Sequence, residues 1–161
     1  TPFQWEPQLA LELIKERQKL LRQSLRRIKG VDFTWHEAEM SFLEAVFARG
    51  DRRLAPVLER AFRMGSRLDA WSDSFDFSLW EEAFQKEGLE PDYYVYFHPE
   101  TSDPLPWDHI SAGVSKHFLI SEYKKALEEE ITGDCRVNGC AGCGLENCPI
   151  QAGEAGCTTI S

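Results

Sequence analysis

The residues of this chain that could do chemistry are its cysteines, and they gather at one end. All five lie in the last 27 residues of the 161-residue chain, at Cys135, Cys140, Cys143, Cys148 and Cys157. Cysteines that served only as small buried hydrophobes would be spread through the core. Thiolates are soft, charged donors that bind zinc and iron–sulfur clusters. The clustering therefore predicts a local task for this tail, and metal binding is the leading candidate.

The spacing of the cysteines bears on which metal centre they could form. The first three form C-x4-C-x2-C, which with a more distant fourth cysteine is the spacing of plant-type ferredoxins. Cys148 or Cys157 could supply the fourth ligand. A structural zinc site usually has two C-x2-C pairs or a Cys/His combination, whereas this chain has one pair and its nearest upstream histidine is His117. We expect an iron–sulfur cluster, with zinc as the alternative.

The surroundings of the cysteines also bear on their role. Gly139, Gly142 and Gly144 flank the C-x2-C pair, where glycines allow a positive φ and let amides point at sulfur. The alternatives to metal binding are disulfides, or reduced thiols in a disordered tail that do little. An odd cysteine count without a secretory signal argues against a secreted disulfide framework, so we expect a reducing cytoplasm.

Three arginines form a first candidate contact for substrate or phosphate outside the tail. Arg49, Arg52 and Arg53 surround a predicted helix start, where guanidiniums and unpaired amides could bind phosphate or carboxylate. The alternative is that Asp51 caps the helix and pairs with its neighbours, as interspersed surface charges usually do.

A second candidate contact is the triplet Trp107, Asp108 and His109, with Lys116 downstream. Histidine and aspartate are suitable proton carriers, so this group could supply acid–base chemistry. After two nearby prolines such a triplet is more often a structural latch, in which the tryptophan packs, the aspartate caps and the histidine binds the backbone.

The elements that must position these residues are predicted to be mainly helices. Apolar periodicity and terminal signals predict helices over residues 8–29, 42–49, 52–63, 78–88 and 116–129. The expected caps are Ser41 with Glu44, Asp51, Asp76 or Ser78, and Ser115. Residues 31–35 alternate and are rich in β-formers, which predicts a short strand. We expect a small, mainly α domain with at most one or two short strands over residues 1–132, then a Cys/Gly-rich tail over 133–161.

Charge is distributed unevenly along the chain. The net charge is −9, yet residues 1–30 carry seven Lys and Arg against three Glu, which leaves −13 on the rest. An acidic protein is a poor general nucleic-acid binder, although a local basic helix could still contact RNA or another domain. The ordinary alternative is a solvated helix face. No apolar run approaches the roughly 20 residues of a membrane span, so no membrane partner is expected.

Several strings of residues, spread over nearly the whole chain, carry a resemblance to a known family. They are Thr1-Pro-Phe-Gln-Trp-Glu6, Phe33-Thr-Trp-His36, Ser41-Phe-Leu-Glu-Ala-Val-Phe-Ala-Arg-Gly-Asp-Arg-Arg53, Asp69-Ala-Trp71, Leu105-Pro-Trp-Asp-His-Ile110, Gly113-Val-Ser-Lys116 and Asp134-Cys-Arg136. Together they resemble the C-terminal region of large radical S-adenosylmethionine (radical SAM) proteins. The group in question is the poorly characterised one with an N-terminal domain of the cobalamin-binding type.

The resemblance implies that the chain follows, and packs on, the radical SAM barrel of the same polypeptide. The family's C-x3-C-x2-C, which holds the [4Fe-4S] cluster that cleaves S-adenosylmethionine, is absent from these residues and would lie upstream. The tail departs from the family's C-x2-C-G-x-C pattern, because Leu145, Glu146 and Asn147 separate Gly144 from Cys148. Cys148 is therefore the weakest match among the ligands.

Two functions of different classes are expected from these features. The first is an accessory domain of a radical SAM enzyme that carries an auxiliary iron–sulfur cluster or a zinc ion on the cysteine tail. The second is a non-catalytic module that docks RNA or a protein and caps the barrel, through the basic first helix, Arg52, Arg53 and the Trp107 loop. A purely structural cap would instead expose a large apolar face.

Overall fold

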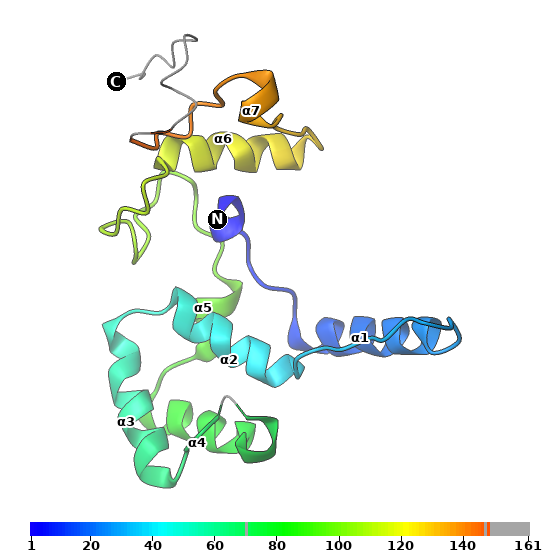
Figure 1. The fold of residues 1–161 in the computed structure, drawn as a ribbon. Coiled ribbons are helices and arrows are strands. Elements are labelled where there is room, and N and C mark those ends of the chain that lie inside the picture. Colours follow the sequence, from blue (N-terminus) through cyan, green and yellow to red (C-terminus); the bar gives the residue numbers. More distant parts are fainter. Residues whose placement is uncertain (70, 147, 149–161) are drawn as a thin grey trace. The chain divides into compact units, whose positions relative to one another are not determined.

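A computed structural model describes residues 1–69, 71–146 and 148, and this part of the chain is mainly helical (Figure 1). The α-helices are α1 (Leu11–Leu25), α2 (Ala38–Arg49), α3 (Ala55–Met64), α4 (Phe77–Glu87), α5 (Pro91–Tyr96), α6 (Lys116–Leu127) and α7 (Cys135–Asn138). Three 3-10 turns are η1 (Pro2–Trp5), η2 (Arg52–Leu54) and η3 (Ser72–Ser74). The described residues contain no strand, so the predicted mainly α fold class is confirmed.

The chain divides into two compact units, which are described separately. One unit is the continuous segment Pro7–His98, which holds α1 to α5. The other joins Thr1–Glu6 to the segment that starts at Pro99, and it holds η1, α6 and α7. No helix in the described part of the chain is long and apolar enough to cross a membrane.

The continuous unit is built around a core between α2, α3, α4 and α5. Eleven of its side chains are buried together: Phe42, Leu43, Val46, Leu54, Val57, Ala61, Trp80, Ala83, Phe84, Tyr94 and Val95. Gly50 has little room for a side chain where η2 follows α2, because a Cβ there would lie 2.0 Å from Leu54 Cδ1 and 2.8 Å from the carbonyl oxygen of Val46. Burial of these apolar side chains is the main stabilising contribution to this unit.

Helix α1 differs from its neighbours because none of its residues is buried. It is joined to the start of α2 by an ion pair between Lys15 and Glu39 at 2.5 Å. Gln18 Nε2 also donates a hydrogen bond to the carbonyl oxygen of His36, at 2.9 Å. The helix is shorter at both ends than the predicted range 8–29.

The predicted strand over residues 31–35 is wrong. This segment is irregular, and the rings of Phe33 and Trp35 stack on each other with centroids 5.2 Å apart. A strand needs a partner strand to pair its backbone groups, and the described residues contain no strand that could pair with this segment. Local preference for extended backbone was therefore not enough.

Three of the predicted helix caps are confirmed and one is wrong. Asp51, Asp76 and Ser115 each accept a hydrogen bond from a backbone amide at the start of η2, α4 and α6. Ser41 is not a cap, because α2 begins at Ala38, three residues earlier. Ala38 is itself buried, so packing extends the helix beyond the expected capping box.

The second unit has a much smaller core. Its buried side chains among the described residues are Trp5, Leu105 and Tyr123, and the rings of Trp5 and Tyr123 lie 5.6 Å apart. The N-terminal segment is held by two side-chain hydrogen bonds: Tyr123 Oη donates to Glu6 Oε1 at 2.5 Å, and Trp107 Nε1 donates to Gln4 Oε1 at 2.7 Å. The first six residues are thus part of the unit that carries the cysteines.

Candidate metal centre

The cysteines begin at a short helix that the sequence analysis did not predict. Helix α7 starts at Cys135 and is capped by Asp134, whose side chain accepts a hydrogen bond from the Arg136 amide at 2.9 Å. The guanidinium of Arg136 then binds the same carboxylate, and this ion pair lowers the pKa of Asp134. The pattern repeats the Asp51 cap, where Arg53 supplies both the amide and the guanidinium. This D-x-R pattern is the signal that could have predicted α7.

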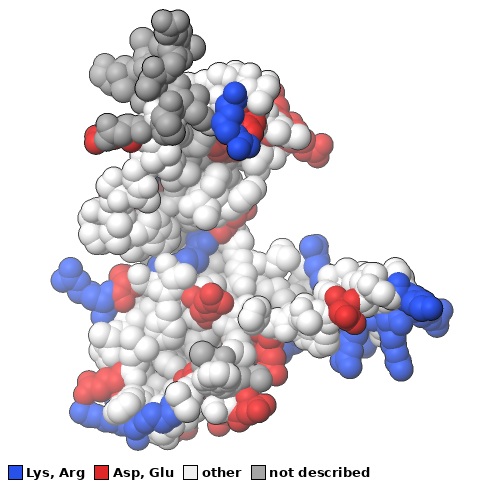
Figure 2. All heavy atoms as spheres, in the orientation of Figure 1, with Lys and Arg blue, Asp and Glu red and all other residues white. Residues whose placement is uncertain are grey.

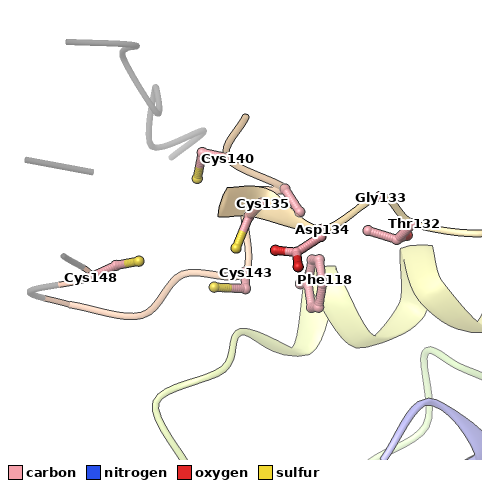
Figure 3. A pocket seen from close by; sticks show the side chains of 9 residues that line it. Phe118, Thr132, Gly133, Asp134, Cys135, Cys140, Cys143 and Cys148 are labelled. Atoms are coloured by element: carbon pink, nitrogen blue, oxygen red, sulfur yellow. The ribbon is translucent and has the colours of Figure 1, made fainter. Parts of the chain in front are cut away.

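All four described cysteines line one cavity of about 280 Å³. Figure 3 shows the sulfur atoms of Cys135, Cys140, Cys143 and Cys148 directed toward this shared space. Each of the four residues is half-buried. The remaining walls come from Phe118 on α6 and from the turn before α7. Cysteines separated by up to 13 positions in the sequence are thus brought to one place.

The glycines between the cysteines have the backbone conformation that the sequence predicted. Gly139, Gly142 and Gly144 have φ values of 86°, 72° and 85°, in the left-handed region that favours glycine. The amide of Gly142 donates a hydrogen bond to Cys140 Sγ at 3.4 Å. Amide donors to sulfur stabilise a thiolate and tune the metal that it binds.

The segment that carries the described cysteines, residues 133–146 and 148, is called the cysteine loop, and one side of it is fixed to the N-terminus of α6. The Ser115 amide donates to the carbonyl oxygen of Cys143 at 2.9 Å, while its Oγ accepts from the Phe118 amide at 3.1 Å. Gly144 lies so close to Ser115 that a Cβ would meet the serine Cβ at 3.0 Å. Ser115 therefore caps the helix and positions the loop through different atoms.

The other side of the loop is anchored by a polar triad, which Glu122 and Lys125 of α6 form with Thr132 of the segment after the helix. Thr132 Oγ1 donates to Glu122 Oε1 at 2.6 Å, and Lys125 Nζ donates to both, at 2.9 Å and 3.0 Å. The hydrogen bond from Thr132, and then the charge and hydrogen bond of Lys125, lower the pKa of Glu122. No sequence motif joins Glu122 to Thr132, so their hydrogen bond could not be predicted from the sequence.

The cavity is larger than a single metal ion requires. Zinc bound by four thiolates at about 2.3 Å holds its sulfur atoms about 3.8 Å apart. Among the described residues, no three His, Cys, Asp or Glu side chains come together closely enough to hold a single ion. A space of about 280 Å³ exceeds the ~150 Å³ cavity that accommodates benzene in an engineered protein. The donors are soft thiols, which suit an iron–sulfur cluster and also zinc. The alternative fourth ligand, Cys157, lies outside the described residues.

The predicted arginine group lies in the other unit and is largely engaged within the protein. Arg53 binds Asp51 through Nε and Nη2, at 3.0 Å and 2.7 Å, and its guanidinium lies over the rings of Tyr93 and Tyr94. Arg49 Nη2 donates to the Phe97 carbonyl oxygen at 2.6 Å. Arg52 is exposed. An anion site at these arginines stays a prediction.

The Trp107 loop has the contacts of a latch. Asp108 Oδ2 accepts hydrogen bonds from Lys116 Nζ at 2.7 Å and from the Leu105 amide at 3.0 Å. The Lys116 ammonium and then this amide lower the pKa of Asp108, which makes it a poor proton carrier near neutral pH. Trp107 packs against the small core, and His109 is exposed.

We compared the chain with protein-family models, curated proteins and solved structures. None of them matched. The interpretation of the site therefore depends on its own geometry and on the sequence features described above.

Proposed function

We propose that this chain is the C-terminal accessory domain of a radical SAM enzyme and that its cysteine loop holds an auxiliary iron–sulfur cluster. The observation that carries the proposal is the convergence of four cysteines on one cavity. Cys135, Cys140 and Cys143 would be ligands, with Cys148 as the fourth. The assignment to radical SAM proteins is supported by the residue strings that resemble that family.

The small core of the cysteine-bearing unit supports a bound metal centre. This unit has about 70 residues and three buried core side chains among those described. Units of this size rarely gain enough stability from their core alone, and natural ones add disulfides or a metal. A cluster would join α6, α7 and the cysteine loop at one point.

The chemistry of such a cluster would be electron transfer or substrate binding at an iron site. The residues of this chain would hold it, and the Gly142 amide would tune it through the hydrogen bond to Cys140. Cleavage of S-adenosylmethionine would belong to the upstream barrel. Reduced cysteines fit a protein of the cytoplasm, where we place this one.

The cluster is tested by anaerobic purification of the full chain, with analysis of iron, zinc and acid-labile sulfide and a visible absorption spectrum. Stoichiometric iron and sulfide are expected, with a thiolate-to-iron absorption band. Zinc without acid-labile sulfide would show that the cysteines hold a structural zinc ion and not an iron–sulfur cluster. If a folded sample contained neither iron nor zinc, the proposal would be wrong.

Matched cysteine variants identify the ligands. Cys135→Ala, Cys140→Ala and Cys143→Ala should each abolish cluster retention. Cys148→Ala should also abolish cluster retention, whereas Cys157→Ala should retain the cluster. The reverse result would make Cys157 the fourth ligand.

The assignment to radical SAM proteins has its own test. The coding sequence that precedes the codon for Thr1 should encode C-x3-C-x2-C. An upstream sequence without it would contradict the radical SAM assignment while leaving the cluster unaffected.

A further inference from the structure

Helix α1 and the irregular segment after it enclose two adjoining cavities on the continuous unit. One, of about 210 Å³, is lined by Lys15, Gln18, Lys19, Arg22 and Trp35. The other, of about 470 Å³, is lined by Arg22, Leu25, Arg26, Val31, Phe33 and Trp35. Because they share Arg22 and Trp35, they form one groove, which we call the α1 groove.

The α1 groove is cationic in an acidic protein. Every charged residue that lines it is a lysine or an arginine. Lys15 is paired with Glu39, whereas no ion pair joins Lys19, Arg22 or Arg26 to a carboxylate in the part of the chain that the structure describes. Figure 2 shows Lys and Arg side chains gathered along α1. Residues 31–161 carry a net charge of −13. Long-range attraction would therefore favour the approach of an anionic partner to α1.

The floor of the groove is an aromatic platform. Trp35 is 44% exposed, and its ring stacks on Phe33 with centroids 5.2 Å apart and planes inclined by 21°. The guanidinium of Arg22 lies 5.3 Å from the centre of the Trp35 ring. Gln18 fixes this segment to α1 through His36. A large ring is thus held in place beside three cations.

We propose that the α1 groove binds single-stranded RNA. Lys19, Arg22 and Arg26 pair with phosphates. One unpaired base stacks on Trp35 in place of the Arg22 guanidinium, which lies over that ring in the free protein and turns to a phosphate on binding. This combination of cations and aromatic rings is how proteins bind single strands, because a base face needs stacking and a phosphate needs a cation. RNA presents unstacked bases in its loops, bulges and ends, whereas bases in a duplex are hidden from such a platform. The proposal does not depend on the cluster, which lies in the other unit.

The test is fluorescence anisotropy with the full chain and a labelled single-stranded RNA of mixed sequence, about 12 nucleotides long. Trp35→Ala should weaken binding roughly tenfold, which is typical for loss of one stacked base. Trp71→Ala is the matched control, since Trp71 is 68% exposed in the same unit outside the groove, and it should leave affinity within about twofold of wild type. Trp35→Phe should recover most of the affinity.

Salt dependence tests the phosphate contacts. Three phosphate contacts predict a loss of affinity of about 20-fold between 50 mM and 200 mM salt, and Arg22→Ala should reduce the slope of log affinity against log salt by about 0.7. Arg63→Ala, an exposed arginine on α3, should leave the slope unchanged. Cysteine variants that lose the metal should bind RNA as wild type does.

Four results would overturn the proposal. The first is no binding at low salt, and the second is wild-type affinity in Trp35→Ala. The third is equal or tighter binding of polyglutamate, which would make an acidic protein the partner. Equal binding of duplex RNA would also contradict the stacking platform. Circular dichroism of each variant confirms that the helices are intact.

Discussion

At the scale of single residues, the candidate metal centre depends on glycines as much as on cysteines. Gly142 combines a φ of 72° with an amide that points at Cys140 Sγ. Gly139 and Gly144 also have positive φ values, which other residues rarely adopt. Residues with a Cβ adopt this conformation only at a cost of about 1–2 kcal/mol.

Gly142→Ala should lower metal retention although it removes no ligand. The added Cβ strains the left-handed backbone and turns the amide away from Cys140. Iron and sulfide per chain should fall below wild type after desalting. Gly30→Ala is the matched control, because Gly30 has a φ of 80° with open space around it and lies in the other unit. It should lose a similar amount of stability and keep its metal; equal metal loss in both variants would contradict the role of Gly142.

The Glu122 anchor should make the attachment of the cysteine loop depend on pH. The pKa of Glu122 is lowered in the folded protein from an ordinary value of 4.5. Stabilisation from the carboxylate is therefore present above about pH 4.5 and is lost as the pH falls through the lower folded value. Glu122→Gln should be less stable than wild type at about pH 6, and the difference in stability should be smaller at about pH 3. Urea unfolding at both pH values measures this, and an unchanged difference at low pH would contradict it.

At the scale of elements, helix starts show where sequence signals succeed. A side-chain acceptor fixes the start of α4 and α6, as at Asp76 and Ser115, because it satisfies an amide that the helix leaves unpaired. The same signal failed at Ser41, where burial of Ala38 moved the start of α2. A capping side chain therefore predicts the start of a helix only when the residues just before it do not pack into the core.

The substitutions Ser115→Ala and Ser41→Ala should have different effects on the free energy of unfolding. Loss of the Ser115 cap should lower the free energy of unfolding by about 1 kcal/mol. Ser41 lies inside α2, where alanine is a better helix former, so its replacement should be neutral or slightly stabilising. Thermal unfolding of both variants measures the contrast. An equal loss would show that Ser41 caps a helix after all.

At the scale of the whole molecule, the division into two units matters most. The continuous unit has eleven buried core side chains, whereas the unit with the cysteines has three among the described residues. Hydrophobic burial scales with the area removed from water, so the second unit depends more on other contributions. A bound metal centre would supply one.

Metal removal should therefore loosen one unit selectively. Chelation or acid treatment should raise amide exchange in residues 99–146 and leave residues 38–96 protected, as measured by hydrogen–deuterium exchange. Leu54→Ala is the converse variant: it should cost about 3 kcal/mol in the continuous unit and leave the metal content unchanged. Loosening of both units to the same extent on metal removal would contradict their separate stabilisation.

Much of the fold follows from local sequence signals. The helical class, the caps at Asp51, Asp76 and Ser115, and the left-handed glycines could be predicted because each depends on a few adjacent residues. The candidate ligands could be named from residue type and spacing alone. The sequence of this chain determines which groups are available and where helices start.

Only the tertiary structure decided which distant groups meet. Spacing could not show that Cys135, Cys140, Cys143 and Cys148 line one cavity, nor that Glu122 anchors the loop. It also predicted a strand at residues 31–35, where the fold instead places Trp35 beside Arg22 in the α1 groove. A strand requires a partner strand, and a cavity requires walls from several segments. These segments lie far apart in the sequence, and local conformational preference does not show which of them come together.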